Sequence, residues 1–356
     1  MLKISVVVVC YNERENIDQC ISSLMKQNYS HDFYETIFVD NNSTDGTKEI
    51  ISSYAKKYAN IRLIINPVRG IAGSRNLGLM NAQYDYVAFM DADCYAPESW
   101  LEKLAAGFER HYTIDKKTAA VGGSNVPPEQ HSRFYDVLNI FLNTYLGSHG
   151  SVQGKRFQID KKVPHLPTVN VLYDKNVLRA VGGYDITFTN IGEDQDLSYR
   201  LAKNGYHFYY LAGAEITHKL RPDLRKWLQN MFVYGKGRMW LMRKHPDRVE
   251  WPLLLPAVFV FSLPFTLLAF IHFVFLAPLL YFVLVLVASF LECAGKRKLK
   301  YFIDLFVLYV GTHIAYGLGE WYGLIKNREL FRQKTQPQLM IMAEMESLNR
   351  VKADFQ

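Results

Sequence analysis

The stretch Tyr86-Val87-Ala88-Phe89-Met90-Asp91-Ala92-Asp93 decides the fold and locates a candidate site. Its first five residues are uncharged and apolar or aromatic, which predicts a buried strand. Two carboxylates separated by one small residue follow this strand directly. Ligands of open α/β sheets bind at the carboxyl ends of the strands, and two carboxylates at this spacing can share one divalent cation. The sequence therefore predicts a metal site here, with a solvated acidic turn as the alternative.

The residues on either side of this stretch alternate between strand-like and helix-like patterns. Strands are expected at Ile4–Cys10, Thr36–Val39 and Ile61–Ile65, and apolar residues at helical spacing occupy the segments between them. Such alternation predicts an α/β fold with a doubly wound, mostly parallel sheet. Residues 125–162 show a poor pattern and are expected to be rich in loops, which suits substrate binding. Later strands are expected at Ala119–Gly123, Thr168–Tyr173 and Tyr206–Leu211.

Polar side chains stand at the end of each of the first four expected strands. Because parallel strands end at the same edge of a sheet, we expect these groups to line one ligand-binding edge. Taken singly, each has an ordinary structural explanation, such as a turn cap for Asp40 or a solvated helix cation for Arg75. No GxGxxG follows the first strand and no GxxxxGK[ST] occurs, so a dinucleotide fingerprint and a P-loop are excluded. The strand-end groups are Tyr11 with Glu13, Asp40, Arg69 to Arg75, and Asp91 with Asp93. The glycine-rich segment Arg69–Asn76 is expected to be a basic loop that leads into a helix over Leu77–Ala82.

Four short motifs at these strand ends, in this order, resemble the nucleotide-sugar half of inverting family-2 glycosyltransferases with a GT-A fold. The resemblance implies a nucleoside-diphosphate sugar as donor, with its base and ribose held by Tyr11, Glu13 and Asp40. It also implies that Arg75 faces the nucleotide or the diphosphate, with Arg69 as the second candidate. The motifs are Val7-Val8-Val9-Cys10-Tyr11-Asn12-Glu13, Val39-Asp40-Asn41-Asn42-Ser43-Thr44-Asp45-Gly46-Thr47, Gly73-Ser74-Arg75-Asn76-Leu77-Gly78 and Asp91-Ala92-Asp93.

The same resemblance gives the acidic pair Asp91 and Asp93 a role. In the family this pair holds Mg²⁺ or Mn²⁺ on the donor diphosphate, so both are expected metal ligands and Asp91 is also an expected donor contact. Enzymes with this fold sometimes place a late histidine on the metal or the diphosphate, and His218 follows the last expected strand. A lone histidine is more often structural, so both interpretations of His218 stay open.

A second acidic cluster lies at Gly192-Glu193-Asp194-Gln195-Asp196, ahead of a helical apolar pattern. Acids at a helix N-terminus suit the macrodipole, which would explain one or two of them. The cluster also resembles the acidic catalytic motif of inverting family-2 enzymes, which places the general base at Asp194 with Glu193 and Asp196 supporting it. A carboxylate can deprotonate an attacking hydroxyl, and a metal and arginines can neutralise the leaving diphosphate. Direct displacement of this kind inverts the anomeric carbon and needs no carboxylate nucleophile.

The C-terminal third of the chain has the composition of a membrane region. Residues 222–244 combine tryptophans and leucines with Lys and Arg, which predicts an amphipathic helix at a membrane interface. Residues 252–291 carry no Asp, Glu, Lys or Arg and predict a hairpin of two spans that turns near His272. Residues 301–325 are apolar but contain Asp304, His313 and Glu320, so a third span, a re-entrant segment and an interfacial helix all stay open.

These patterns divide the chain into four parts. We expect a cytosolic GT-A glycosyltransferase domain over 1–220, an interfacial helix over 221–250, a membrane region over 251–325 and a tail over 326–356. A net charge of +7 with 49% hydrophobic and 14% aromatic residues favours membrane lipids as partners over nucleic acid. The four cysteines have no pairing or metal-ligand spacing, which is typical of reduced thiols that face the cytosol. We expect the plasma membrane as location, with the catalytic domain on its cytoplasmic side.

The resemblance implies a metal-dependent inverting glycosyltransferase of polysaccharide biosynthesis that acts on a hydroxyl of a lipid-linked or polymeric glycan. One alternative is transfer to a polyprenyl phosphate, an acceptor that is already ionised and needs no base. The other is a non-catalytic membrane scaffold that binds sugar nucleotides, which would have no use for acids at Asp91, Asp93 and Asp194. Gln229 and Arg238-Met239-Trp240 lack the QxxRW spacing of processive synthases, so processivity is not implied.

Overall fold

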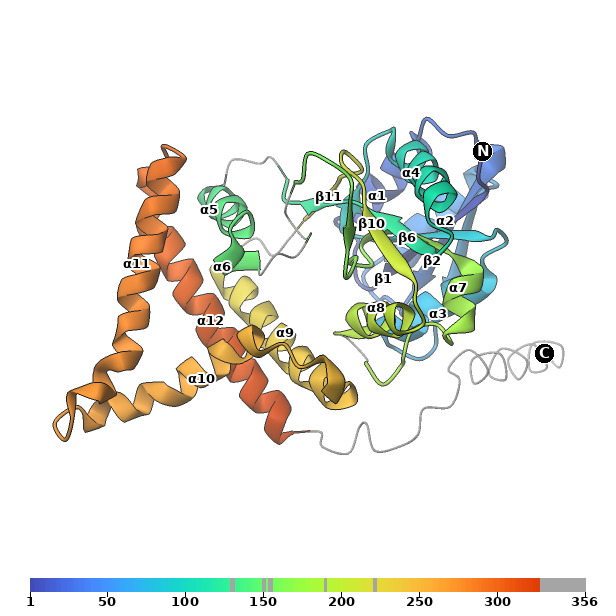
Figure 1. Ribbon diagram of the computed structural model, residues 1–356. Coiled ribbons are helices and arrows are strands. Elements are labelled where there is room, and N and C mark those ends of the chain that lie inside the picture. The colour runs from blue at the N-terminus through green and yellow to red at the C-terminus, as the bar shows by residue number, and fades with distance from the viewer. Residues whose placement is uncertain (129–131, 149–151, 153–155, 189–190, 220–222, 327–356) are drawn as a thin grey trace. The chain divides into compact units, whose positions relative to one another are not determined.

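The computed structural model describes residues 1–128, 132–148, 152, 156–188, 191–219 and 223–326 (Figure 1). These residues form two compact units. The first unit consists of the described residues of 1–126 and 156–219, and the second of those of 127–154 and 223–326. The described residues of 127–154 lie inside the range expected for the catalytic domain, yet they belong to the second unit.

The first unit is built around an eight-stranded mixed sheet in the order β3-β2-β1-β4-β9-β6-β10-β8. Its first four strands along the chain pair in parallel, as the strand–helix alternation predicts. Strand β9 runs antiparallel between β4 and β6, and β8 runs antiparallel to β10, so the second half of the sheet is mixed. The strands are β1 (Ile4–Cys10), β2 (Tyr34–Asp40), β3 (Ile61–Ile65), β4 (Tyr86–Asp91), β6 (Thr118–Gly122), β8 (Lys161–Val163), β9 (Asn170–Asp174) and β10 (His207–Tyr210).

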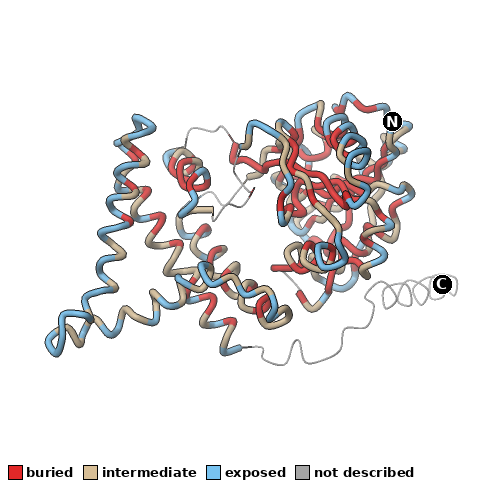
Figure 2. The backbone as a smooth tube through the Cα atoms, viewed as in Figure 1, coloured by how far each residue is buried: buried red, intermediate tan, exposed pale blue. Residues whose placement is uncertain are grey.

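Helices cover both faces of this sheet (Figure 1). Val6 and Val8 of β1 belong to the core that contains the apolar residues of α1 and α4, whereas Val7 points to the other face, against α3. A strand covered on both faces needs a nearly continuous apolar run, and Figure 2 shows these strands as the most buried part of the unit. The helices are α1 (Ile17–Met25), α2 (Thr47–Lys57), α3 (Ile71–Asn81), α4 (Trp100–Ile114), α7 (Lys175–Ala180) and α8 (Glu193–Lys203), with a 3₁₀ turn at His31–Phe33.

The strand register brings the polar strand ends to one edge of the sheet. Cys10, the last residue of β1, lies opposite Asp40, and Val9 lies opposite Asp91. Asp40 in turn lies opposite Ile65 at the end of β3. The expectation that the first four strands end along one edge is therefore confirmed for the backbone.

Helix α3 begins earlier than the sequence indicates. The glycine-rich segment Arg69–Asn76 was expected to be a loop, but the helix starts at Ile71. The side-chain oxygen of Asn41 accepts hydrogen bonds from Gly70 N at 3.3 Å and Ser74 Oγ at 2.6 Å, which ties the first helical turn to the end of β2. Glycine inside this helix serves close packing, because a Cβ at Gly78 would lie 2.3 Å from a methyl of Val7.

A small second sheet completes the first unit. It contains β5 (Cys94–Tyr95), β11 (Ile216–His218) and β7 (Asn125–Val126), in the order β5-β11-β7. The antiparallel pairing of β11 with β5 sets His218 opposite Cys94, one residue after Asp93. This pairing brings the late histidine to the acidic pair.

The second unit is helical, and three of its segments are long and apolar enough to cross a membrane. The expected hairpin corresponds to Trp251–Leu268 and Phe273–Gly295, and the third segment is Leu299–Ile325. Its α-helices are α5 (Arg133–Leu142), α6 (Tyr145–Ser148), α9 (Leu224–Lys244), α10 (Leu255–Ser262), α11 (Ala277–Gly295) and α12 (Phe302–Ile325), with 3₁₀ turns at Pro246–Arg248, Trp251–Leu254, Leu263–Leu268, Phe273–Leu276 and Leu299–Tyr301.

Two helices of this unit differ from expectation. Helix α5 lies in the region expected to be rich in loops, although one face of it is buried and carries Val137, Leu138 and Phe141. The expected amphipathic helix exists as α9, but it packs along α12 (Figure 1). Trp227 of α9 donates a hydrogen bond to Thr312 at 2.9 Å, and a Cβ at Gly235 would lie 2.0 Å from the carbonyl oxygen of Tyr316. Part of the apolar face of α9 is therefore buried against a candidate span.

Candidate active site

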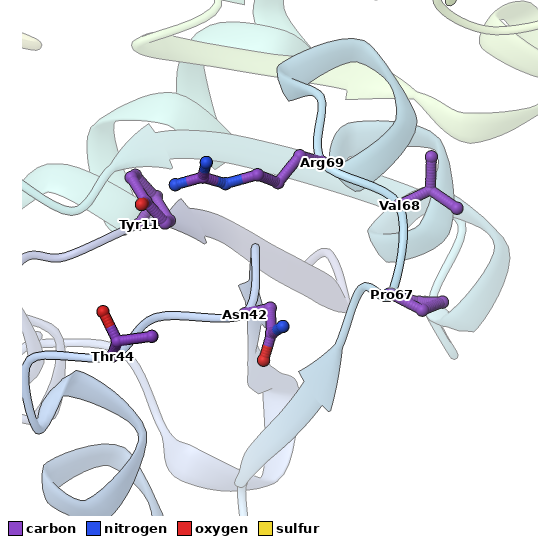
Figure 3. A pocket seen from close by; sticks show the side chains of 6 residues that line it. All are labelled: Tyr11, Asn42, Thr44, Pro67, Val68 and Arg69. Atoms are coloured by element: carbon purple, nitrogen blue, oxygen red, sulfur yellow. The ribbon is translucent and has the colours of Figure 1, made fainter.

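A pocket opens between the ends of β1, β2 and β3. Its volume is about 530 Å³, and its lining includes Tyr11, Arg69 and Asn42. Figure 3 shows the Arg69 side chain extending to the Tyr11 ring, and the guanidinium carbon lies 3.7 Å from the ring centroid. Because Tyr11 is 40% exposed, the pocket presents an aromatic side chain and a cation, which can bind a nucleobase and a phosphate.

Asp40 lies behind this pocket and is fully buried. One of its carboxylate oxygens accepts a hydrogen bond from Ser43 N at 2.7 Å, and the other accepts one from Ser43 Oγ at 2.5 Å. The carboxylate therefore holds the turn that carries Asn42 and Thr44 into the pocket lining. Asp40 can therefore shape this pocket through the turn.

Glu13 lines a second, adjacent cavity that also includes Asn16 and Asp45. Its carboxylate accepts a hydrogen bond from Asn16 Nδ2 at 2.7 Å. Lys219, the residue after β11, donates from Nζ to Asn16 Oδ1 at 3.0 Å. Sequence reasoning missed this cation, since nothing near residue 219 indicates that the end of β11 returns to the end of β1.

Arg75 is the centre of the site. Its guanidinium donates to a carboxylate oxygen of Glu193 and, at 3.2 Å, to Asp91 Oδ1. Arg75 and Glu193 are both buried, and the Tyr184 ring centroid lies 5.6 Å from the guanidinium carbon. Burial alone would lower the pKa of Arg75, but the Glu193 and Asp91 carboxylates outweigh burial and raise it. The arginine therefore stays charged and joins the acidic motif on α8 to the end of β4.

Burial also changes the acid–base behaviour of Glu193. It raises the pKa of this carboxyl from about 4.5 to about 7, against the opposing charge of Arg75 and with a further contribution from Asp194. Glu193 Oε2 is buried and has no hydrogen bond among the described residues. A buried carboxylate oxygen without a partner is costly, which adds to the preference of Glu193 for its protonated form.

The structure brings Asp93 and His218 together. Asp93 Oδ1 lies 3.3 Å from His218 Nε2, and the other ring nitrogen lies 3.0 Å from the side-chain amide of Asn125. Cys94 is the third residue of this cluster, but burial raises the pKa of its thiol far above the usual range, which disfavours the thiolate. Asp91 lies outside this cluster of described residues and binds Arg75 instead.

These donors fit a hard divalent cation. A carboxylate oxygen with an imidazole nitrogen suits Mn²⁺, and a carboxylate also suits Mg²⁺. Asn125 Oδ1 is buried without a hydrogen bond among the described residues. Turning this amide would let Oδ1 accept from His218 Nδ1, which would direct the Nε2 lone pair toward the space beside Asp93.

The two aspartates of α8 have different surroundings. Asp194 is partly exposed, accepts a hydrogen bond from Gln195 N at 2.7 Å, and has its Oδ2 3.6 Å from His165 Nε2. Asp196 is fully buried and binds Arg200 at 2.8 Å. Arg200 in turn donates to the backbone carbonyls after α7, so Asp196 anchors α8 to that turn. This geometry gives Asp196 a structural contact, and its supporting role in catalysis stays a prediction.

Comparison with known proteins agrees with this arrangement. The family model described as Glycosyl transferase family 2 matches residues 5–182. The glycosyltransferase AglE of Haloferax volcanii is 28% identical over 69% of this chain and 76% of its own length. A dolichyl N-acetyl-α-D-glucosaminyl phosphate 3-β-D-2,3-diacetamido-2,3-dideoxy-β-D-glucuronosyltransferase of Methanococcus voltae is 24% identical over 92% of this chain and 99% of its own length.

The fold also matches a solved structure. The mannosyltransferase PcManGT of Pyrobaculum calidifontis, determined with GDP-Man and Mn²⁺, superposes with a TM-score of 0.57 at 18% sequence identity. The superposition covers 92% of this chain and 88% of that one. At this identity the likeness shows the GT-A-like fold, a mixed sheet flanked by helices, and carries no statement about the ligands of this chain.

Proposed function

Because the chain belongs to glycosyl transferase family 2, and is thus a glycosyltransferase, we propose the reaction that its site performs. The enzyme moves a sugar from a nucleoside-diphosphate sugar to a hydroxyl of a lipid-linked or polymeric glycan, with inversion at the anomeric carbon. The observation that carries this proposal is the contact of Arg75 with both Asp91 and Glu193. One buried cation thereby joins the strand end where a diphosphate would lie to the acidic motif that would meet the acceptor.

The donor nucleotide is assigned to the pocket at the ends of β1 to β3. The Tyr11 ring offers a stacking face for the base, and Arg69 can turn from this ring to a phosphate. Asp40 acts through the turn that it holds, and Glu13 lies in the adjoining cavity. The mannosyltransferase of similar fold was solved with the nucleotide sugar GDP-Man, which supports this assignment.

Asp93 and His218 would hold Mg²⁺ or Mn²⁺, with Asp91 beside them. When bound, the cation would neutralise charge that develops on the leaving diphosphate. Arg75 adds a fixed positive charge next to Asp91 that needs no reorganisation during the reaction. The related mannosyltransferase was solved with Mn²⁺, which supports a divalent ion in this fold.

Asp194 is the proposed general base. It is the exposed member of the acidic motif, and as a carboxylate it can accept the proton of the attacking hydroxyl. Glu193, held by Arg75, supports Asp194 by fixing the start of α8 against the end of β4. Transfer to a polyprenyl phosphate would not require Asp194 as a general base, because that acceptor is already ionised.

The second unit and the relatives support the proposed acceptor and location. Three candidate spans associate the enzyme with a membrane, and the relative from Methanococcus voltae is named for a dolichyl-phosphate-linked sugar acceptor. We place the catalytic unit on the cytoplasmic side of the plasma membrane, with the basic segment Lys296–Lys300 on the same side. Labelling of a cysteine introduced at Lys298 by an impermeant reagent added to intact cells would contradict this orientation.

The test of the function uses the purified full chain in detergent micelles with Mn²⁺. A panel of nucleoside-diphosphate sugars is offered with alkyl glycosides as soluble acceptors, and release of the nucleoside diphosphate and formation of a glycoside are both followed. We expect one donor to be consumed, with a product anomer opposite to that of the donor by proton NMR. A product that retains the donor configuration, or binding of donors without turnover, would refute the proposed reaction.

A further inference from the structure

A histidine outside the motifs of the sequence analysis contacts the proposed base. We propose that His165 is a positioning residue that holds the Asp194 carboxylate in its reactive orientation. This inference rests on the assignment of Asp194 as the base. Its evidence is a bridge that the two ring nitrogens of His165 make between two residues on one face of α8.

The bridge has a simple geometric basis. Asp194 and Ser198 are four residues apart on α8 and therefore lie on the same side of the helix, one turn from each other. His165 Nδ1 lies 2.9 Å from Ser198 Oγ, and His165 Nε2 lies 3.6 Å from Asp194 Oδ2. The imidazole thus lies along the helix and contacts both positions at once.

The chain that carries His165 is held in place. His165 lies between β8 and β9, with Pro164 and Pro167 near it on either side, and its neighbour Leu166 is fully buried. Proline restricts the backbone of this segment, and the buried leucine anchors it to the core. The ring therefore approaches α8 from a constrained loop.

The contacts select one tautomer of the ring. Ser198 is fully buried, and its hydroxyl can donate to Nδ1, which leaves the proton on Nε2 directed at Asp194. The opposite tautomer would place the Nε2 lone pair against a carboxylate, which is repulsive. At 3.6 Å this contact is an electrostatic approach and not a hydrogen bond, but contacts of catalytic groups often shorten only when the substrate is bound.

These contacts fix the orientation of the Asp194 carboxylate. Asp194 Oδ1 accepts from Gln195 N at 2.7 Å, and Oδ2 faces the N–H of His165. With one contact on each oxygen, rotation about the side chain is restricted and a free lone pair keeps its direction toward the acceptor. Loss of the histidine should therefore lower kcat while leaving donor binding unchanged, because a small misplacement of a reacting group costs roughly 10–10²-fold in rate.

Two substitutions separate the two ends of the bridge. His165→Gln keeps an N–H near the position of Nε2, toward Asp194, whereas His165→Asn keeps one only near Nδ1, toward Ser198. The matched control is His207→Gln, which removes a histidine–carboxylate pair of the same kind at Asp115, where Nδ1 and Oδ2 are 2.6 Å apart. That pair joins the start of β10 to the turn before β6 and involves neither α8 nor Asp194.

Turnover is measured on the full chain with the donor and alkyl glycoside identified as above. We expect His165→Asn to lower kcat by roughly 10–10²-fold at unchanged donor KM, His165→Gln to restore most of the loss, and His207→Gln to have no effect. In the Asp194→Asn background, His165→Asn should cause no further loss. Equal losses from His165→Asn with and without Asp194, or wild-type kcat in His165→Asn, would overturn the inference.

A second readout needs no acceptor. The ¹⁵N chemical shifts of the His165 ring report which nitrogen carries the proton, and we expect the Nε2–H tautomer in the wild type and its partial loss in Ser198→Ala. A ring in the Nδ1–H tautomer would overturn the inference. Full activity of Asp194→Asn would instead refute the base assignment, so the two failures are distinguishable.

Discussion

Arg75 on α3 and Glu193 at the start of α8 form a buried ion pair across 118 positions of the chain. The pair fixes the acidic motif against the strand end that carries Asp91, because the same guanidinium binds Asp91 at 3.2 Å. The site thus depends on one guanidinium group, which donates hydrogen bonds to two carboxylates from different elements. A lysine has the same charge but cannot make both contacts with one planar group.

Arg75→Lys therefore should lower kcat by roughly 10–10³-fold, the usual cost of losing a positioned donor beside developing charge. The matched control is Arg62→Lys. Arg62 forms an ion pair with Glu35, with an N···O distance of 2.9 Å, and this pair lies outside the site. Steady-state turnover with saturating donor checks the prediction. Equal kinetics for the two variants would show that Arg75 contributes charge alone.

Substitution of the proposed metal ligands should weaken the binding of the ion more than the binding of the donor. We expect His218→Gln to weaken Mn²⁺ binding by roughly 10–10²-fold in the presence of a nucleoside diphosphate, and Asp93→Asn to weaken it further. Cys94→Ala is the control, since burial keeps this thiol protonated and a poor ligand. Titration calorimetry with Mn²⁺ gives the affinities. Full transfer activity in excess chelator would contradict a metal role.

The raised pKa of Glu193 predicts a pH dependence of stability. Between a pH of about 4.5 and about 7, the Glu193 carboxyl is ionised in the unfolded chain but protonated in the folded one. This group therefore adds to the free energy of unfolding at low pH, and the addition is lost as the pH rises through the folded pKa. Glu193→Gln lacks this contribution. The difference in melting temperature between wild type and Glu193→Gln should therefore become less favourable to the wild type from pH 5 to pH 8.

Thermal unfolding in one detergent at matched ionic strength checks this trend. Arg75 and Asp194 are present in both proteins, so the comparison isolates the titration of Glu193. A difference that stays constant with pH would show that Glu193 titrates at its ordinary value. A difference that grows in favour of the wild type at high pH would show that the charge of Arg75 dominates over burial.

Asp40 offers a test of an indirect effect on donor binding. Asp40→Ala removes both acceptors of the Ser43 bonds, so the turn should loosen and donor KM should rise by roughly tenfold, with kcat little changed. Asp40→Asn can keep one bond to Ser43 N and donate to Ser43 Oγ, and should restore most of the affinity. If both variants weakened donor binding equally, the carboxylate would contact the nucleotide directly.

Some of this organisation could be predicted from sequence because it is local. The apolar run that ends at Asp91 determines a buried strand, and parallel strands necessarily end at one edge, so Tyr11, Asp40 and Asp93 could be placed there without a structure. The helical pattern after Glu193 likewise places an acidic motif at a helix start.

Contacts between distant segments could not be predicted in this way. Strand β9 pairs antiparallel with β4, and no periodic pattern in the sequence indicates this pairing. The loop before β9 carries His165 to Ser198 of α8, a contact that the sequence does not indicate either. The burial of Asp40 and the pairing of Asp196 with Arg200 depend on side-chain partners that the residue types alone do not determine. Helix α5 was missed because its partner surface lies in the C-terminal unit, far along the chain.

The central claim is that Asp194 removes a proton from an acceptor hydroxyl, and one sample tests it most directly. Turnover and melting temperature are measured on the same preparation of Asp194→Asn, which keeps the shape of the side chain but cannot accept the proton. The account predicts a loss of roughly 10²–10⁴-fold in kcat, with donor affinity and melting temperature close to wild type. Near-normal turnover in a stable Asp194→Asn protein would contradict the claim and favour an acceptor that is already ionised.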